Sequence, residues 1–290
     1  MLGKGTWGEL LAAGKEKLRA AGVAEYDLDA WYLFEKAFGI SRMQYFLCSG
    51  DQAEPEEKAL AAYENGIERR SKREPLQHIL GTQEFMGLEF AVSRHVLIPR
   101  QDTEILVEKV LSEQKEKEIS VLDMCTGSGC IGISLAVLGG YRQVDAADIS
   151  EEALAVARAN AAGIPGAGNV CFRQSDLFSE FSPETDRYDV IVSNPPYIPS
   201  GVIEGLEPEV RDFEPRKALD GAEDGLFFYR RLAEECGRFL KENGSVYFEI
   251  GYDQGEAVGS LLRSHGFKDT EVIKDLAGKD RVVCGRWQTA

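Results

Sequence analysis

The sequence predicts an α/β protein with a doubly wound, mostly parallel sheet, preceded by a small all-helical domain that a β-hairpin linker joins to it. From residue 101 onward, helix-like and strand-like segments alternate, which is the pattern of parallel strands joined by crossover helices. Before residue 75, apolar residues recur only at helical spacing. We therefore predict a helical domain over 1–75, a hairpin linker over 76–100 and an α/β domain over 101–290.

The composition is that of a soluble globular chain, with 43% hydrophobic and 28% charged residues among 290. The formal net charge of −16 argues against a broad surface for nucleic-acid phosphates. No apolar run approaches the length of a membrane span, and "MLGKGTWGELLAAGKEKLRA" is amphipathic, unlike a signal peptide. We expect a cytoplasmic monomer without a membrane segment and without stable nucleic-acid binding.

The six cysteines are scattered and include no C-x-x-C pair, so we expect neither a metal site nor a disulfide framework. Buried free thiols in a reducing cytoplasm are the simpler interpretation. The cysteines are Cys48, Cys125, Cys130, Cys171, Cys236 and Cys284.

Helical patterns account for most of the first 75 residues. Thr6 and Glu9 fit a capping box at the start of the first helix. The expected starts of the next three helices are Asp27 or Asp29, Ser41, and Pro55. The last helix ends in the basic run "ERRSKRE", residues 68–74, which we interpret as a solvated helix end.

The rest of the chain divides into a hairpin and alternating elements. "EFMGLEFAV" has a turn at Gly87 between two strand-like pieces. The expected strands are 119–125, 142–148, 169–174, 188–193, 245–251 and 280–287. The expected helices are 102–114, 129–139, 150–163, 226–244 and 254–266. The irregular stretch 199–225 is long for a loop in a compact domain, which indicates function.

The stretch "VLDMCTGSGCIG" places a glycine-rich turn between a strand and a helix. Gly127, Gly129 and Gly132 fit the spacing G-x-G-x-x-G, and Asp148 ends the next strand. Glycines let the backbone approach a ligand, and a carboxylate can bind both ribose hydroxyls. The motif alone predicts a nucleoside cofactor of unspecified kind. A tight turn without a ligand, and a helix-capping role for Asp148, stay open as alternatives.

Two details favour S-adenosylmethionine over a nicotinamide dinucleotide. Asp123, at the end of the first strand, is placed to reach the methionine amino group directly or through water. The pyrophosphate of a dinucleotide approaches the turn closely and requires a small residue just before Thr126. This chain has Cys125 at that position. Asp176 closes the third strand, where an acid would face the adenine amino group. A turn or cap role for Asp176 stays open.

The stretch "SNPPY" follows the strand 188–193 and predicts an amide-binding corner. An amide or exocyclic amine is a poor nucleophile, so a catalyst that methylates it must orient its lone pair. Asn194 can accept one N–H through its side-chain oxygen, and the carbonyl of Pro195 can accept the other. The prolines stiffen the corner, and Tyr197 can stack on a flat substrate group. Such positioning supplies about 7–11 kcal/mol of a barrier. The alternative is a rigid turn.

With both motifs in place, the chain resembles the class I S-adenosylmethionine-dependent methyltransferases. More narrowly, it resembles the HemK/PrmC family, which methylates N5 of a glutamine in peptide-chain release factors. The narrower resemblance rests on "PLQHILGTQEFMGLEF", "VLIPRQDTEILVE", "VRDFEPRKALDGAEDGLFFYRRL", "EIGYDQG" and "DLAGKDRVV", and covers most of residues 75–283. The first 75 residues resemble the family only in being helical. In the family, a helical bundle at this place docks the release factor.

The resemblance implies a set of site residues, S-adenosylmethionine as the cofactor, S-adenosylhomocysteine as its product, and bacterial-type class I release factors as partners. The implied cofactor-binding residues are Cys125, Thr126, Gly127, Ser128, Gly129, Asp148, Asp176, Leu177 and Asn194. The implied substrate-binding residues are Asn194, Pro195, Pro196 and Tyr197, with catalytic roles for Asn194, Pro195 and Tyr197. The chain departs from the family's D-L-G-T-G-S-G at Met124 and Cys125, and from its usual loop at Gln101.

Three other functions share parts of this pattern. Asn-Pro-Pro-Tyr also occurs in adenine-N6 DNA methyltransferases and in enzymes that act on guanine in ribosomal RNA, which usually carry a basic recognition region. A regulator that binds the cofactor without catalysis, and a nicotinamide-dependent oxidoreductase, are the remaining alternatives. We also interpret the acids of the loop after Tyr197 as a surface for a basic partner. They are Glu204, Glu207, Glu209, Asp212 and Glu214.

Overall fold

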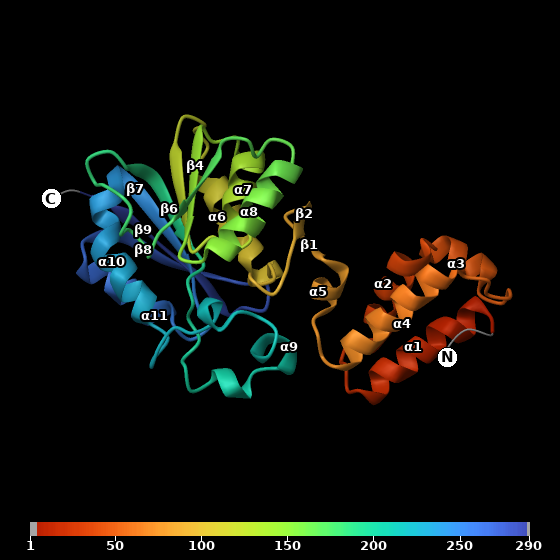
Figure 1. Ribbon diagram of the computed structural model, residues 1–290. Helices are drawn as coiled ribbons and strands as arrows, with labels where there is room; N and C mark the ends of the chain where they lie inside the picture. Colours follow the sequence, from red (N-terminus) through yellow and green to blue (C-terminus); the bar gives the residue numbers. More distant parts are fainter. Residues whose placement is uncertain (1–4, 289–290) are drawn as a thin grey trace. The chain divides into compact units, whose positions relative to one another are not determined.

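The computed structural model describes residues 5–288, which form two compact units (Figure 1). The first unit holds the described residues up to Gly81 together with Glu207–Phe213. The second holds Thr82–Leu206 and the described residues from Glu214 on. The division that we predicted at residues 75 and 100 stays a prediction.

The first unit is all-helical. Its helices are α1 (Trp7–Ala20), α2 (Tyr26–Phe38), α3 (Arg42–Cys48), α4 (Glu57–Ser71), α5 (Leu76–Leu80) and α9 (Pro208–Arg211). The capping box of Thr6 and Glu9 is confirmed, and Ser41 caps α3 as expected. The expected start of α2 was wrong by a few residues, because Asp27 and Asp29 lie in its first turn. Pro55 was also wrong as the start of α4, which begins after Glu56.

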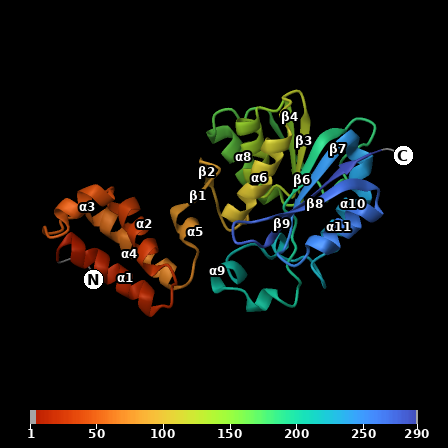
Figure 2. The ribbon, with the colours of Figure 1, turned by 180° about the vertical axis from the view of Figure 1, so that it is seen from behind.

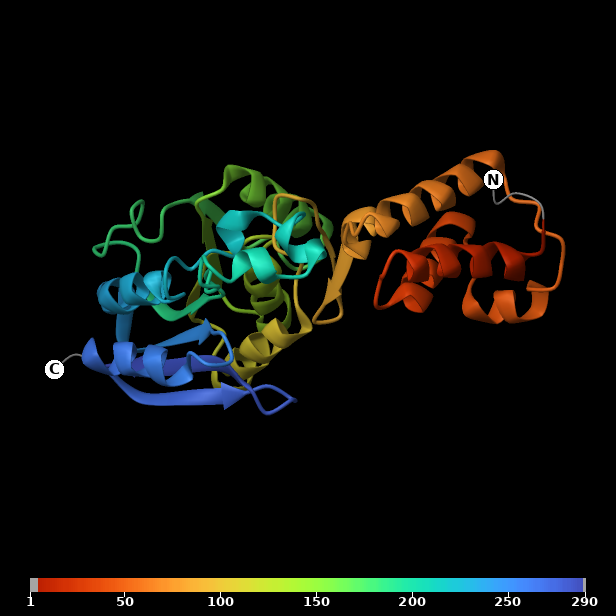
Figure 3. The same cartoon turned by 90° about the horizontal axis from the view of Figure 1, so that it is seen from below.

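Aromatic side chains form the centre of the helical unit, which is red to orange in Figure 3. The fully buried ring of Phe34 has its centroid 5.9 Å from Trp7, 4.9 Å from Phe38 and 5.8 Å from Tyr63, all edge-on. Edge-on ring pairs at these distances add to the free energy gained by burial. Helices α1, α2 and α4 therefore share one core.

The basic end of α4 is not a solvated helix end, and that interpretation was wrong. Arg70 is 6% exposed, and its guanidinium binds Asp29 at 2.6 Å and Glu209 at 2.9 Å. Arg73 binds Glu209 at 2.6 Å and Glu207 at 3.0 Å. Acids far along the chain thus pair with this basic run inside the first unit.

The expected hairpin consists of β1 (Thr82–Phe85) and β2 (Leu88–Ala91). Met86 and Gly87 connect the strands with φ of 52° and 73°. Two positive φ values in a two-residue loop are typical of the tight turn that matches the twist of a hairpin. The N–H of Met86 donates to Glu104, so the hairpin is anchored to the helix that follows it.

The second unit contains a seven-stranded sheet in the order β5-β4-β3-β6-β7-β9-β8 (Figures 1 and 2). Its strands are β3 (Ser120–Met124), β4 (Gln143–Asp148), β5 (Val170–Gln174), β6 (Tyr188–Ser193), β7 (Leu240–Glu249), β8 (Phe267–Lys274) and β9 (Asp280–Trp287). The first five are parallel, and β9 runs antiparallel between β7 and β8. The fold class is confirmed, although β8 was not expected.

Helices cover both faces of this sheet. They are α6 (Gln101–Glu113), α7 (Cys130–Ser134, continued by a π-type turn over Leu135–Gly139), α8 (Glu151–Gly163), α10 (Phe227–Phe239) and α11 (Gly255–Ser264). One core cluster joins α10 and α11 to Leu122, Ile191 and Phe248, and the other joins α6 and α7 to Val121 and Val190. Figure 2 shows these helices on opposite sides of the strands. Within residues 5–288, no helix is long and apolar enough to cross a lipid bilayer.

The six thiols are free as expected, but only three of them are buried, so the predicted burial is confirmed only for those three. Cys130, Cys236 and Cys284 are buried, whereas Cys48 and Cys125 are half-buried. The remaining cysteine, at position 171, is exposed, because β5 lies at the edge of the sheet.

Candidate active site

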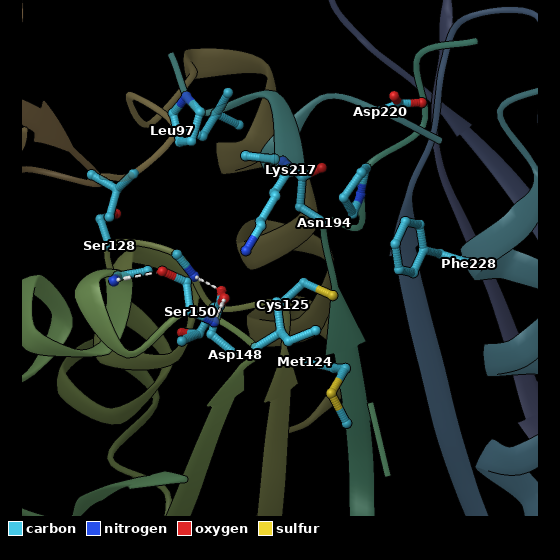
Figure 4. Close-up of a pocket in the computed structure, with 18 of the residues that line it drawn as sticks. Leu97, Met124, Cys125, Ser128, Asp148, Ser150, Asn194, Lys217, Asp220 and Phe228 are labelled. Atoms are coloured by element: carbon cyan, nitrogen blue, oxygen red, sulfur yellow. Dashed lines mark hydrogen bonds between the residues drawn. The ribbon is translucent and has the colours of Figure 1, made fainter. Parts of the chain in front are cut away.

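A cavity of about 670 Å³ lies at the carboxyl ends of the parallel strands (Figure 4). Strands β3 and β6 are neighbours in the sheet but not in the chain, so the strand order reverses between them. A doubly wound sheet binds its ligands in the crevice at this point. The cavity is lined by the turn after β3, by Asp148 at the end of β4, and by Asn194 directly after β6.

The glycine-rich turn after β3 leaves no room for larger residues on its helix side. Gly129 has φ of 83°, and a Cβ there would lie 2.8 Å from Ile133 Cδ1 and 3.2 Å from Ala157 Cβ. A glycine is therefore required for close packing of this turn. Cys125 also has a positive φ, 62°, and its side chain lines the cavity. Figure 4 shows Cys125 beside Asp148 at the strand ends.

Asp148 is held by two backbone donors. The N–H of Gly127 donates to Oδ2 at 2.9 Å, and the N–H of Ser150 donates to Oδ1 at 2.9 Å. Burial raises the pKa of Asp148, and these hydrogen bonds oppose the rise. The helix cap of α8 is Ser150, whose hydroxyl accepts from the N–H of Ala153, so the capping alternative for Asp148 is wrong. Each carboxylate oxygen keeps lone pairs for a ligand.

Asp123 does not line the cavity, which corrects the expected contact with a methionine amino group. Its side chain is fully buried beneath the turn. Oδ2 accepts from the Thr126 hydroxyl at 2.5 Å and from the N–H of Gly132 at 2.9 Å. Burial raises the pKa of Asp123 to about 7. The acid therefore fixes the turn from behind.

The turn after β5 contributes Asp176 and Leu177 to the cavity. The Asp176 carboxylate pairs with Arg231 at 2.7 Å and remains exposed on its other side. Leu177 is buried, with φ of 48°. An acid and an apolar side chain thus lie together at one end of the cavity.

The corner after β6 presents Asn194 and Pro196 to the cavity. The Asn194 amide nitrogen donates to the Thr103 hydroxyl at 3.4 Å, which leaves its side-chain oxygen as a free acceptor in the described structure. Figure 4 shows Asn194 and Asp148 on different sides of the cavity. Gly129, Pro195 and Tyr197 are not among the lining residues. Tyr197 directs its hydroxyl to Glu249 Oε1 at 3.4 Å.

Two segments line the cavity although the sequence analysis gave them no role. The first runs from His95 to Thr103, and the second includes Lys217, whose side chain reaches into the cavity in Figure 4. They are tied together by the buried Glu214, which accepts from Arg100 at 2.6 Å and from the N–H of Ile98. The only local signal for the first segment was "VLIPRQDTEILVE", which carried the resemblance.

Comparison with known proteins extends this description. The PrmC N-terminal domain family matches residues 9–81, and the methyltransferase small domain family matches residues 100–204. A release factor glutamine methyltransferase of Clostridium botulinum is 40% identical, over 96% of this chain and 98% of its own length. One of Geobacter sulfurreducens is 42% identical, over 93% and 92%. The chain belongs to the release factor glutamine methyltransferase family.

Among solved structures, the catalytic domain of hMettl16, in complex with hairpin 6 of the MAT2A 3′ untranslated region, superposes with a TM-score of 0.56. It is 14% identical over 89% of this chain and 91% of its own. At this identity the likeness concerns the fold alone. The antiparallel β9 of this chain departs from the parallel order 3-2-1-4-5-6 of a dinucleotide-binding sheet. Membership of the methyltransferase family also excludes the oxidoreductase alternative.

Proposed function

We propose that this chain transfers a methyl group from S-adenosylmethionine to N5 of the glutamine in the Gly-Gly-Gln motif of peptide-chain release factors. One observation carries the proposal in the structure. A carboxylate suited to a ribose, Asp148, and an amide oxygen suited to a planar N–H, Asn194, line the same cavity at the ends of the two strands that flank β3. The similarity to release factor glutamine methyltransferases over nearly the whole chain supports the glutamine substrate.

The cavity has the chemistry that the cofactor needs. A Cβ added at Gly127 would meet nothing within 4 Å, so the turn leaves open space beside Asp148. We assign the ribose to Asp148, and the adenine to Asp176 and Leu177. The remaining cofactor contacts are assigned to Cys125, Thr126, Gly127 and Ser128, with a minor contact from Asn194, while Gly129 lets the turn pack closely. When bound, S-adenosylmethionine supplies a methyl group activated by a sulfonium.

The corner after β6 orients the substrate amide in this proposal. The side-chain oxygen of Asn194 and the carbonyl of Pro195 each accept one N–H of the glutamine, which directs the nitrogen lone pair at the methyl carbon. Pro196 borders the amide, and Tyr197 buttresses it. As the N–C bond forms, the S–C bond breaks and its electron pair stays on sulfur. The methylated nitrogen then loses a proton to solvent, so no strong base is required.

We further propose that the helical domain, 1–75, docks the release factor, that 76–100 is a linker, and that 101–290 carries the chemistry. A cavity of about 670 Å³ holds a cofactor and a side chain, so a folded substrate must contact another surface. Helix α3 offers one, because Met43, Phe46 and Leu47 are 78%, 83% and 77% exposed.

The cellular setting follows from the proposed substrate. We propose that the enzyme acts in the cytoplasm, where release factors work, and as a monomer. The net charge of −16 supports the absence of a stable complex with nucleic acid. The adenine-N6 or other nucleic-acid methyltransferase is thereby the disfavoured alternative.

The function is tested by transfer of labelled methyl from S-adenosylmethionine. The purified protein is offered a bacterial release factor, the same factor with its Gly-Gly-Gln glutamine changed to alanine, and unmethylated duplex DNA. We expect label on the intact release factor only. Label on DNA, or equal label on the alanine variant, would refute the proposed substrate while leaving the cofactor assignment intact.

The docking surface is tested by Met43→Ser, Phe46→Ser and Leu47→Ser combined. No residue of α3 is buried, so the variant should fold. We expect a higher KM for the intact release factor and an unchanged KM for a short Gly-Gly-Gln peptide. Leu138→Ser, at an exposed position of the second unit, is the matched control. An unchanged KM for the whole factor would reject this surface.

A further inference from the structure

An ion pair lies at the end of the cavity that Asp176 and Leu177 line. Arg231, in the second turn of α10, donates through Nη1 to Asp176 Oδ1 at 2.7 Å. The two residues are 55 positions apart in the chain, so the contact joins α10 to the turn that follows β5. Asp176 lines the cavity, whereas Arg231 is not among the lining residues. Any effect of Arg231 on a ligand would therefore pass through Asp176.

The carboxylate of Asp176 has the contacts of a recognition residue and not those of a helix cap. A turn or capping acid accepts from the N–H groups of nearby residues. Oδ1 of Asp176 accepts from the guanidinium instead, and within residues 5–288 no backbone N–H donates to either oxygen. In this turn, the Ser179 hydroxyl accepts from the N–H of Asp176. Oδ2 of Asp176 therefore keeps its lone pairs for a ligand.

A second contact holds the guanidinium of Arg231. Its central carbon lies 5.8 Å from the ring centroid of Phe227, which precedes it by four residues on α10. Residues four apart lie on one face of a helix. A guanidinium within about 6 Å of an aromatic ring is attracted to its face. Because Phe227 lines the cavity too, Arg231 is held between two residues of the same cavity wall.

We propose that Arg231 is a positioning residue that fixes the Asp176 carboxylate as the acceptor for the adenine amino group, and thereby sets the base selectivity of the cofactor site. This inference rests on the proposed function, in which Asp176 and Leu177 take the adenine. An Asp side chain without a partner exchanges between staggered rotamers. The ion pair occupies Oδ1 and leaves Oδ2 to the base, and an ionised carboxylate can only accept hydrogen bonds.

This arrangement distinguishes an amino group from a carbonyl group. Adenine presents N–H donors on its exocyclic nitrogen, whereas hypoxanthine carries a carbonyl oxygen at the same place. Opposite a carboxylate, that oxygen leaves two acceptors facing each other without a proton between them. A site built to accept a hydrogen bond rejects a ligand that lacks the donor. The side chain of Asp176 is 52% exposed, so solvent screens the ion pair and keeps its effect small.

The test measures the binding of S-adenosylhomocysteine and of S-inosylhomocysteine by calorimetry at low ionic strength. We expect the unaltered protein to prefer the adenine compound by at least about tenfold. Arg231→Met should raise the Kd for S-adenosylhomocysteine by about fivefold and leave the Kd for S-inosylhomocysteine nearly unchanged. Arg231→Lys should recover part of the loss, because the cation remains. Arg230→Met is the matched control, since Arg230 pairs with the exposed Asp224 and neither residue lines the cavity.

A double variant tests whether Arg231 acts through Asp176. Once Asp176→Asn is in place, Arg231→Met should have little further effect on either Kd. Equal losses of affinity for the two compounds in Arg231→Met would mean a structural role and would overturn the inference. An unchanged preference for adenine in Arg231→Met, or the same loss with and without Asp176→Asn, would overturn it as well.

The outcome also separates this inference from the proposed function. A protein that shows the expected base preference but does not methylate the release factor would refute the proposed substrate and support the role of Arg231. A protein that binds neither compound would overturn both.

Discussion

At the residue scale, Asn194 and Asp148 line one cavity but serve different partners in the proposed function. Asn194→Ala removes the substrate acceptor and leaves the Asp148 contacts intact. We expect cofactor Kd to stay within a few-fold while transfer falls by at least about 100-fold. Asp148→Ala should weaken cofactor binding, and transfer should recover at high cofactor concentration. Calorimetric binding and labelled-methyl transfer on the same preparations measure both.

The opposite pattern would change the assignment. Equal losses of binding and turnover in Asn194→Ala would make Asn194 a cofactor ligand or a structural residue. A loss of transfer in Asp148→Ala that saturating cofactor cannot restore would place Asp148 in the chemistry itself.

Cys125 offers a separate test of the turn, since its backbone has the left-handed conformation that favours glycine. A β-branched residue at φ of 62° clashes with its own backbone. We expect Cys125→Val to lower the free energy of unfolding by about 1–2 kcal/mol. Cys125→Gly should leave the free energy of unfolding nearly unchanged. The glycine relieves the backbone strain of the folded state, but it also gives the unfolded chain more conformational freedom, and the two effects oppose each other. Urea unfolding of the two variants compares them, and equal stabilities would contradict the strain argument.

At the element scale, the sequence was informative where the signal is local. The capping box at Thr6, the cap at Ser150 and the turn at Gly87 each lie within a few residues of the structure they specify. Strand β8 was not expected, because "FKDTEVIK" mixes charged and apolar residues and lies at the sheet edge, where little of it is buried. The expected helix 226–244 runs five residues too far, since pairing with β6 draws Leu240 into β7.

The same distinction between local sequence signals and tertiary packing applies to the site residues. Residues that directly follow a strand, such as Asp148 and Asn194, could be predicted, because parallel strands end at one edge of the sheet. Thr103 and Lys217 could not, because tertiary packing brings α6 and the long loop to that edge. Their sequence neighbourhoods carry no motif that physical reasoning can interpret alone.

The loop between β6 and α10 was interpreted as an acidic surface for a basic partner, and its contacts correct that interpretation. Glu209 pairs with Arg70 and Arg73, Glu214 with Arg100, and Glu204 with Arg216. These acids are neutralised within the chain. Their function is therefore to hold the loop in place.

Glu209→Ala tests this role for the loop. It leaves the buried Arg70 with Asp29 as its carboxylate partner and the carbonyl of Glu74 as a second acceptor, and we expect the free energy of unfolding to fall by about 1–3 kcal/mol. Asp212→Ala is the matched control, because Asp212 is exposed and its ion pair within the described chain is with its neighbour Arg211. It should change stability by less than about 0.5 kcal/mol. Equal effects in a thermal or urea melt would restore the surface interpretation.

At the scale of the whole molecule, two fully buried acids contribute to the way in which stability responds to pH. Burial raises the pKa of both Asp123 and Glu249 to about 7. Between their unfolded pKa values, near about 4, and pH 7, the folded chain binds protons that the unfolded chain has released. The contribution to stability is thus complete below pH 4 and is lost as the pH rises through 7.

We therefore expect the free energy of unfolding to fall between pH 5.5 and pH 8, by about 2 kcal/mol for each of the two acids. Urea unfolding at a series of pH values measures it. Asp123→Asn and Glu249→Gln should each reduce the slope by a similar amount, because each replaces a titrating group by a neutral one of equal size. Stability that is constant or rises over this range would mean that both carboxyls are ionised when folded.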